Sequence, residues 1–507
     1  MKLLFSLLTF LTLTFSAAAN WIEFPIGVDG DGNPVIAHVT EEDFNIGSTK
    51  FRTLIVCEPG KAAELKKLDF GAGVSASIIE VGDGAAFPPK GTAYQGEHAV
   101  AQSIWRWLGM HAPDYVIHLR PQDDLGLLAA LRAGRPCDVG EIPGVAAADG
   151  DALVAIEKVH VAAKGWPSPA RLELQNRVAR SPIEVAEALS AHYPGQVKSI
   201  AYIPAVALIG RMRTGELTEN AEHLDFAKEQ LTKWLEKKPD TPQNFSGAYI
   251  SGNLMFPEYA QRANDDRAWD RTVEAGHLGL DADGKPLKVL PSHNQMSDAV
   301  FMGCPAMAEA GARSGDERFY VACVNQMRSI QEWCLREDGL YRHSPLDEAA
   351  WGRGNGFPVL GLSLSLSVMA EDFEGYEEVQ ASLTNHLAAL IKHQDQSGMF
   401  HQVIDRPESY REFTSTCMIT FSILRGLRNG WLDRATYEPV ADRAWTAIKQ
   451  RIALDGKGLV DVCTGTGKQK NLRAYYERKA ILGHDDRGGA MALMVATERA
   501  FWDREKS

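Results

Sequence analysis

The spacing of apolar residues changes once along the chain, close to Arg180. Before that point, FPIGVDGDGNPVIAHV (residues 24–39) has two partly alternating apolar runs around a Gly/Asp/Asn-rich turn, the pattern of a β-hairpin. FRTLIVCEP and APDYVIHLR each hold a short continuous apolar run, as buried strands do. EHAVAQSIWRWLGM between them fits an amphipathic helix. The order strand, helix, strand predicts a smaller α/β domain over residues 20–179.

After Arg180 the apolar residues recur at helical spacing and strand signals nearly vanish. RSPIEVAEALSAHYPG (residues 180–195) begins with a Ser-Pro start signal and links the two regions. Short turns such as SGDER and NGWLD then separate paired helices, as in antiparallel helical hairpins. The expected pairs are 200–214 with 221–237, 246–264 with 266–276, 295–313 with 316–336, 357–370 with 374–394, 411–428 with 433–452, and 471–480 with 485–502. Six successive hairpins predict an (α/α)6 barrel, a closed α/α toroid, over residues 180–507; an open solenoid would show a tighter sequence repeat.

The first residues predict export. MKLLFSLLTFLTLTFSAAAN has a Lys at position 2, an apolar run to about Phe15, and small residues ending at Ala19. This is the order of a secretory signal peptide, whereas a membrane anchor needs a longer apolar run and a polar flank. We expect cleavage after Ala19 and a secreted or periplasmic protein without a membrane span.

Charge and cysteine content narrow the range of partners. A net charge of −13 over 507 residues argues against nucleic acid, whose phosphates require a basic surface. A local Arg can still bind an acidic sugar. The seven cysteines lack CxxC pairs and a zinc-binding pattern, which favours buried free thiols over a disulfide framework. No motif for a metal or an organic cofactor is present, and we expect neither.

Five segments of the helical half resemble, in order, the motifs of the unsaturated uronyl hydrolases of glycoside hydrolase families 88 and 105, chiefly the unsaturated rhamnogalacturonyl hydrolases. They are NQMSDAVFMGCPAMAEA (294–310), DGLYRH (338–343), WGRGNGF (351–357), HQDQSGMFHQVIDRPESYREFTSTCM (393–418) and CTGTG (463–467). Each motif alone is unspecific. Five in register along one helical domain carry the resemblance, which covers roughly residues 195–505.

The first domain does not share that resemblance. Its start is similar to the opening of zinc carboxypeptidase-like domains, in which a strand leads into a His and a Glu that hold the metal. Here the strand leads into CEPGKAAE, with Glu58 but no nearby His. We therefore expect a degenerate, accessory domain rather than a zinc peptidase.

The resemblance implies a hydrolase that needs a single carboxylic acid. Ordinary glycosidases use two carboxylates, but the unsaturated uronic acid left by a polysaccharide lyase is a vinyl ether. Protonation of its C4 gives an oxocarbenium-like centre at C5, water adds there, and the resulting hemiketal releases the neighbouring sugar. One Asp can donate the proton and then accept one from the water. By resemblance this is Asp298, whose apolar neighbours would favour the protonated acid; without the motif it would be an ordinary helix Asp.

The same resemblance assigns substrate contacts around AWGRGNGF (350–357). Arg353 would pair with the uronate carboxylate and Trp351 would stack on a sugar face, while the alternating glycines would break any helix and let a loop approach the ligand. A plain glycine-rich connector would explain the glycines but not the Trp and Arg together. Further contacts are expected from His343, which is equally well explained as structural, from Asn294 and Gln295, which would also suit a helix cap, and from Phe357.

Two departures from the family pattern affect the substrate preference. Many members carry a second Asp before the first helix of the second hairpin, but TPQNFSGAYISGN (241–253) has no carboxylate. Either that Asp is dispensable, or Asn244 or Asn253 replaces it in binding, or activity is impaired. Phe357 replaces the closing Trp of the glycine motif, which keeps an apolar surface and removes an indole donor.

Two other functions stay open on the sequence alone. Some polysaccharide lyases also use helical toroids, and Tyr341, Tyr410, Tyr475 and His401 are available as bases. A non-catalytic protein that binds acidic glycans would fit the missing second Asp. The sequence names neither the polysaccharide (rhamnogalacturonan, ulvan or a similar glycan), nor the sugar at the +1 position, nor the oligomeric state. One hypothesis for the first domain is that it covers a mouth of the barrel and shortens the usable substrate.

Overall fold

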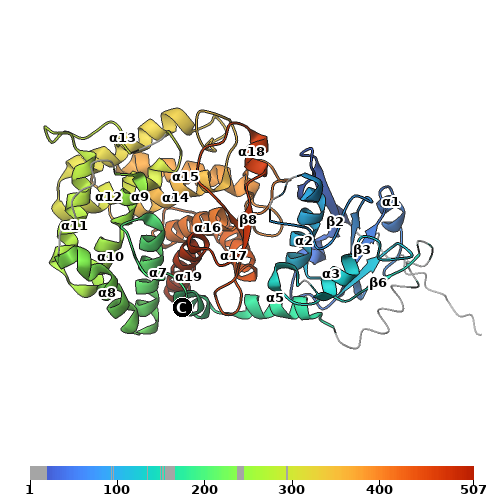
Figure 1. Cartoon of the computed structure of the whole chain (residues 1–507). Coiled ribbons are helices and arrows are strands. Elements are labelled where there is room, and N and C mark those ends of the chain that lie inside the picture. Colours follow the sequence, from blue (N-terminus) through green and yellow to red (C-terminus); the bar gives the residue numbers. More distant parts are fainter. Residues whose placement is uncertain are drawn as a thin grey trace, which may run out of the picture.

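The computed structural model describes residues 20–92, 94, 96–133, 135–148, 150, 154, 166–236, 245–292 and 295–506. The segment 1–19, for which the sequence predicts a signal peptide, lies outside these residues. A sheet domain and a helical barrel lie side by side along the long axis of the molecule (Figure 1). None of the described helices is long and apolar enough to cross a bilayer. All seven cysteines are buried free thiols, as the sequence predicted.

The sheet domain is built on six strands in the order β1-β2-β4-β3-β5-β6. Their bounds are β1 (Trp21–Val28), β2 (Pro34–Thr40), β3 (Phe51–Cys57), β4 (Val74–Glu80), β5 (Tyr115–His118) and β6 (Gly144–Ala146). The β1–β2 hairpin is antiparallel, and β2 pairs antiparallel with β4, whereas β3, β4, β5 and β6 run parallel. The predicted hairpin and the two predicted buried strands, β3 and β5, are confirmed; β4 and β6 were not predicted.

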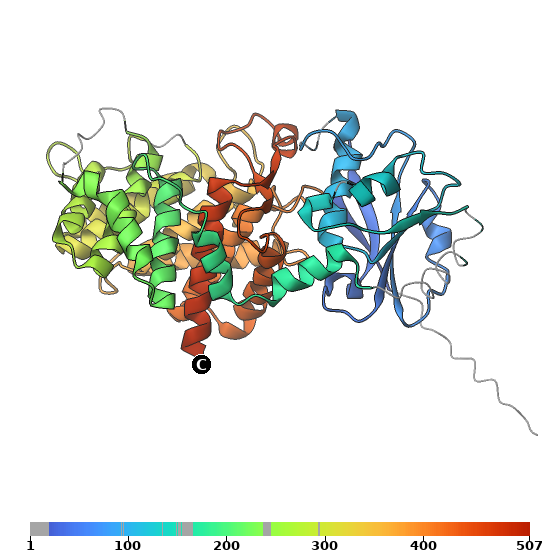
Figure 2. The same cartoon turned by 60° about the horizontal axis from the view of Figure 1, so that its bottom comes forward.

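Helices cover both faces of this sheet (Figure 2). They are α1 (Ala62–Leu65), α2 (Ala99–His111) and α3 (Leu127–Ala133). Every residue of β3 is buried. Leu54 and Val56 pack in the core beneath α2 and α3, and Ile55 and Cys57 pack on the opposite face with α1. A strand covered on both faces gives the continuous apolar run seen in the sequence.

The predicted (α/α)6 barrel is confirmed (Figures 1 and 2). The inner ring is formed by α7 (Tyr202–Thr218), the interrupted pair α9 (Gly247–Gly252) and α10 (Met255–Ala263), α12 (Ala299–Ser314), α14 (Gly352–Leu366), α16 (Phe413–Arg428) and α19 (Asp486–Lys506). The outer ring is formed by α6 (Pro182–Ser190), α8 (Glu222–Glu236), α11 (Asp266–Gly276), α13 (Glu317–Cys334), α15 (Tyr376–Leu390) and α17 (Arg434–Gln450). The predicted domain boundary falls between α5 (Pro169–Ala179) and α6.

The sixth hairpin differs from the prediction. The expected helix over residues 471–480 is only α18 (Leu472–Tyr476), followed by strand β8 (Ala480–Gly483), which pairs with β7 (Leu459–Cys463). The long helix α19 packs instead against α6, the first helix after the boundary, and against α7 and α16. The ring is therefore closed by helices from opposite ends of the domain, a pairing that local sequence order cannot indicate.

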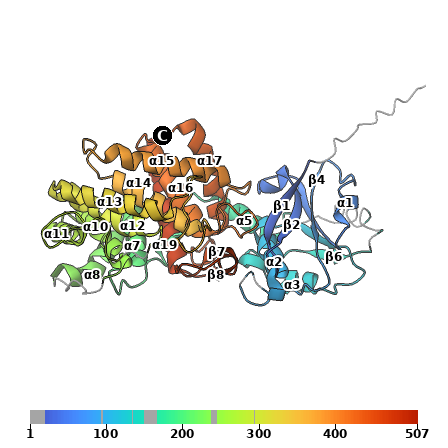
Figure 3. The ribbon, with the colours of Figure 1, turned by 90° about the horizontal axis from the view of Figure 1, so that it is seen from above.

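A buried ion pair network joins the two domains. Asp461, on β7, accepts hydrogen bonds from Nε of Arg106 on α2 at 2.9 Å and from Nε of Arg451 at 3.2 Å, and all three residues are buried. Nearby, Tyr94 of the sheet domain stacks on Tyr410 of the barrel, with ring centroids 4.9 Å apart. Figure 3 shows β7 and β8 on the side of the barrel that faces the sheet domain.

We expect Asp461→Asn to destabilise the protein by about 3–5 kcal/mol, because the change leaves two buried guanidinium groups without their counter-charge. Asn tolerates the positive φ of 65° at this position, so the loss would reflect charge and not backbone strain. Equilibrium denaturation would measure it. The control is Asp266→Asn, which breaks the exposed pair with Arg313 and should cost less than about 1 kcal/mol. Equal effects of the two changes would refute the role assigned to Asp461.

Candidate active site

The glycine motif begins a helix and is not a loop, which corrects the sequence-based expectation. Helix α14 starts at Gly352, directly after Trp351, so Gly352, Gly354 and Gly356 occupy its first two turns. A Cβ at Gly352 would lie 2.5 Å from the backbone oxygen of His401, and one at Gly356 would lie 2.8 Å from the Met418 side chain. The glycines thus allow neighbouring segments to approach the helix closely, and this gain offsets their low helix propensity.

Gly354 faces the candidate catalytic residues. A Cβ here would lie 2.9 Å from Oγ of Ser297, 3.3 Å from Cδ2 of His343 and 3.3 Å from Cε3 of Trp351. These three side chains therefore gather around one bare position on α14. Ser297 immediately precedes Asp298, and its backbone N–H donates to the carbonyl of His343 at 3.0 Å. Helix α14 thereby sets the position of the turn that carries Asp298.

Asp298 and His343, two residues predicted from sequence, lie together. Asp298 precedes the first turn of α12 and is 3 % exposed. Its Oδ1 lies 3.5 Å from Nε2 of His343, which is fully buried. Within the described residues, neither of these two atoms makes a hydrogen bond, and nor do Oγ of Ser297 or Nε1 of Trp351. Buried polar atoms are normally paired, so a cluster of unpaired ones marks this place as the candidate site.

The other ring nitrogen of His343 is held by Tyr475. The distance from Nδ1 to the Tyr475 hydroxyl is 2.9 Å, and burial raises the pKa of Tyr475 to about 12, so the hydroxyl stays neutral. When this hydroxyl donates to Nδ1, the neutral imidazole carries its proton on Nε2, directed at Asp298. The sequence suggested Tyr475 only as a possible base. Its contact with a residue 132 positions away has no local signal.

Arg353 and Trp351 are also neighbours, but both are buried. The Arg353 guanidinium lies 4.8 Å from the Trp351 ring centroid, and Arg478 lies 4.5 Å from the same ring. Arg353 donates through Nη1 to the carbonyl of Cys463 at 2.8 Å and through Nη2 to that of Gly465. In this arrangement Arg353 holds the CTGTG segment, so the predicted pairing with a uronate would require these bonds to be exchanged.

A buried carboxylate supports the same segment. Glu412 accepts hydrogen bonds from the first backbone N–H groups of α16 and from N–H of Cys463 at 2.9 Å. Burial by itself lowers the pKa of the Arg353 guanidinium. The Coulombic attraction of Cys463, Tyr202 and Glu412 is stronger than this effect and raises the pKa above its usual value. Arg353 therefore keeps its charge. Neither the role of Glu412 nor that of Tyr202 was predicted, because both depend on contacts between distant segments.

The other residues predicted from the sequence have different surroundings from the Asp298–His343 pair. Phe357 packs in the barrel core, 5.4 Å from Phe301 and 5.8 Å from Tyr202 between ring centroids. Gln295 is exposed and has a positive φ of 51°. Asn253 is buried, and its Nδ2 donates to the carbonyls of Tyr249 and Ile250, so its amide is used within α9. Asn294 and Asn244 lie outside the described residues.

Comparison with known proteins identifies the family. Residues 176–501 match the model of Glycosyl Hydrolase Family 88, so the chain belongs to this family and is a glycoside hydrolase. It is 23 % identical over 290 residues to the unsaturated rhamnogalacturonyl hydrolase YesR of Bacillus subtilis, covering 53 % of this chain and 81 % of the relative. It is 26 % identical over 219 residues to an unsaturated 3S-rhamnoglycuronyl hydrolase of Formosa agariphila, covering 40 % of this chain and 56 % of that protein.

Solved structures share the fold of the helical part. A family 105 glycoside hydrolase of C. acetobutylicum aligns with a TM-score of 0.55 at 18 % identity, over 63 % of this chain and 98 % of that one. A family 88 glycosyl hydrolase from Bacteroides vulgatus aligns with a TM-score of 0.54, also at 18 % identity, over 64 % of this chain and all of that one. A protein described as a polysaccharide lyase aligns equally well, with a TM-score of 0.55 over 65 % of this chain and 98 % of that one. The fold by itself therefore does not separate a hydrolase from a lyase.

We expect Gly354→Ala to lower kcat by at least about tenfold, because the added methyl group must displace Ser297, His343 or Trp351, and small displacements of catalytic groups are costly. The free energy of unfolding should change only slightly, because the higher helix propensity of Ala, worth about 1 kcal/mol, offsets part of the strain from the added methyl group. Steady-state kinetics and thermal unfolding would measure both. Gly195→Ala is the control, because a Cβ there meets open space; an active Gly354→Ala variant would show that close packing is not needed.

We expect Tyr475→Phe to lower kcat by roughly tenfold with little change in KM, because one hydrogen bond that orients His343 is lost. The pH profile of kcat should also shift, since His343 loses the partner that fixes its tautomer. Tyr476→Phe is a matched control in the next residue: its hydroxyl pairs with Glu408 at 2.5 Å, away from His343. If both variants keep wild-type kcat and pH dependence, Tyr475 does not position His343.

Proposed function

We propose that this glycoside hydrolase removes a 4,5-unsaturated uronic acid from the non-reducing end of lyase-generated acidic oligosaccharides, such as those of rhamnogalacturonan or ulvan. The observation that carries the proposal is the buried pair of Asp298 and His343, 3.5 Å apart at the start of α12. The five sequence motifs and the named activities of the relatives in B. subtilis and F. agariphila support the substrate class.

Asp298 acts as the single general acid and base in this proposal. Its carboxyl gives a proton to C4 of the vinyl ether, and positive charge develops at C5. A water molecule adds to C5 and loses a proton to the same carboxylate, which restores the acid. The hemiketal then opens and releases the neighbouring sugar.

His343 and Tyr475 orient the acid, and Trp351 and Arg353 form the wall beside it. A His that donates from Nε2 stabilises the carboxylate left after the first proton transfer. Arg353 provides a fixed positive charge close to the position where a uronate would bind, once its bond to the Gly465 carbonyl is exchanged for the substrate. The absence of a second family Asp in residues 241–253 is consistent with this scheme, since it assigns both proton transfers to Asp298.

Three of the four candidate lyase bases are engaged elsewhere, and the fourth, Tyr475, holds His343. Tyr410 stacks on Tyr94, and Tyr341 packs edge-on against His386. His401 donates from Nδ1 to the carbonyl of Ser409 at 2.8 Å, and its Nε2 lies 3.4 Å from Oδ2 of Asp395. Each of these three residues already has a packing or bonding role away from Asp298.

We also propose that the protein is exported, on the basis of the signal peptide pattern in residues 1–19.

The proposal is tested by following the ultraviolet absorbance of the conjugated double bond in lyase-digested rhamnogalacturonan and ulvan. Wild type should consume the chromophore, and Asp298→Asn should lower kcat by at least about a hundredfold, because Asn can neither give nor accept the proton. Asp316→Asn, the same change at the N-cap of the adjacent helix α13, should leave kcat unchanged.

Three outcomes separate the alternatives. An increase in absorbance on intact polysaccharide would identify a lyase. Tight binding of unsaturated oligosaccharides without any loss of absorbance would identify a glycan-binding protein. Consumption of the chromophore at an equal rate by wild type and Asp298→Asn would retain the reaction but remove Asp298 from it.

A further inference from the structure

A large cleft lies between the sheet domain and the barrel, apart from the Asp298 site. Its volume is about 1020 Å3, at the upper end of the range of about 300–1,000 Å3 for small-molecule sites. One wall comes from β1, the short helix η1 (Glu41–Phe44) and α2; the other comes from residues 394–397 and the end of α17. We define this interdomain cleft by Phe44, Trp107, Gln396, Arg443 and Gln450.

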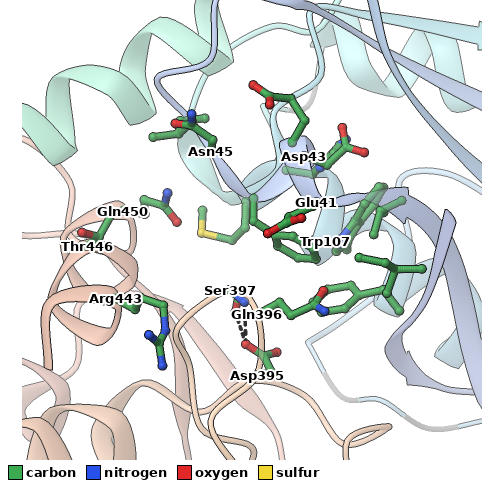
Figure 4. A pocket seen from close by; sticks show the side chains of 18 of the residues that line it. Glu41, Asp43, Asn45, Trp107, Asp395, Gln396, Ser397, Arg443, Thr446 and Gln450 are labelled. Carbon is green, nitrogen blue, oxygen red and sulfur yellow. Dashed lines mark hydrogen bonds and ion pairs between the residues drawn. The ribbon is translucent and has the colours of Figure 1, made fainter. Parts of the chain in front are cut away.

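The two walls differ in chemistry. Figure 4 shows Trp107 of the sheet domain across the cleft from Arg443, Thr446 and Gln450, which project from the barrel. Trp107 is 9 % exposed and stacks on His111, with ring centroids 4.2 Å apart, and the half-buried Phe44 and Met110 extend this apolar wall. The barrel wall offers amide, hydroxyl and guanidinium groups. A sugar ring has the same division, with an apolar C–H face and polar hydroxyls around its edge, so the cleft is complementary to carbohydrate.

Several polar groups of this cleft are free to bind. Among the described residues, the side chains of Gln396 and Gln450 have no hydrogen bond partner, and Glu41 has neither a hydrogen bond nor an ion pair. Within the part of the chain that the structure describes, Arg443 donates only to the amide oxygen of Gln394, at 2.6 Å, and pairs with no carboxylate. By contrast, Arg411 and Arg451, which also line the cleft, are bound to Asp395 and Asp461. The unpaired groups of the cleft thus include a cation, an anion and side-chain amides.

This set of free groups indicates uncharged sugar units rather than an isolated anion. Glu41 and Arg443 carry opposite charges, so the cleft has no excess of positive charge, and a carboxylate accepts hydrogen bonds from sugar hydroxyls as readily as an arginine donates them. The volume exceeds the need of a single small ion. The walls are also held in place, because Arg451 belongs to the network around Asp461 that joins the domains. A preformed site loses little entropy on binding.

We infer that the interdomain cleft is a second, non-catalytic binding site for the neutral sugar units of an oligosaccharide. The inference takes its substrate class from the proposed function but does not depend on the chemistry of Asp298. It would give the sheet domain a function: it supplies the apolar wall of a site that the barrel alone cannot form. The barrel would then retain a long oligosaccharide while Asp298 acts on its unsaturated end.

The test uses a tetrasaccharide of rhamnose, which is uncharged and which the hydrolase reaction cannot consume. Calorimetry should detect binding to the full-length protein, and the double change Arg443→Ala with Gln450→Ala should weaken it by roughly tenfold or more. Arg434→Ala, which removes an exposed Arg from the other end of the same helix, is the matched control and should bind as wild type does. Hydrolysis of an unsaturated disaccharide should be unchanged in both variants.

A second measurement reports on the cleft without weakening it. The indole N–H signal of Trp107, assigned by its loss in Trp107→Phe, should shift in the NMR spectrum when the tetrasaccharide is added. Equal affinity of wild type and the double variant, together with an unchanged Trp107 signal, would overturn the inference. Failure of the proposed function would appear separately, as a wild-type protein that binds the tetrasaccharide through the cleft but does not hydrolyse the unsaturated disaccharide.

Discussion

The first turns of α14 lie almost in contact with three neighbouring segments, and the candidate active site depends on this close approach. Gly352 faces the backbone of His401, Gly354 faces Ser297 and His343, and Gly356 faces Met418. A Cβ at any of these positions would separate the segments. These glycines lower the helix propensity of α14, but they allow Asp298, His343 and Trp351 to lie close together. The packing across the barrel mouth offsets the loss of helix propensity.

The sheet domain is connected to this mouth through polar contacts. Arg473, in α18, donates to the carbonyl of Gly30 in the turn of the β1–β2 hairpin. The same short helix carries Tyr475, which holds His343 at 2.9 Å. A contiguous set of contacts thus runs from the hairpin through α18 to His343 and Asp298. These contacts and the buried Asp461 network together hold the two domains against each other. The domains accordingly share one apolar cluster, which contains Val28, Tyr94, Trp351 and Tyr475.

Sequence reasoning succeeded where the signal is local. The β1–β2 hairpin follows from the turn at Asp29, whose carboxylate accepts hydrogen bonds from the N–H groups of Asp31 and Asn33. Asp298 and His343 were each suggested by a motif of the family pattern, and the structure places them side by side. The bond of Tyr475 to His343, the bond of Glu412 to Cys463 and the placement of Arg443 and Gln450 in the cleft were not predicted, since they join segments far apart in the sequence.

The amino-acid sequence by itself determined the class of each half and the order of the first five helical hairpins, and it suggested the candidate residues of the proposed reaction. Periodicity and turn chemistry act over a few residues, and these features need no more. Only the tertiary structure decided that AWGRGNGF starts a helix, that α6 and α19 close the ring, and that Arg353 is bonded to the CTGTG segment. Those outcomes depend on steric contacts and buried charges between segments that lie far apart in the sequence, where the free energy of packing outweighs local propensity.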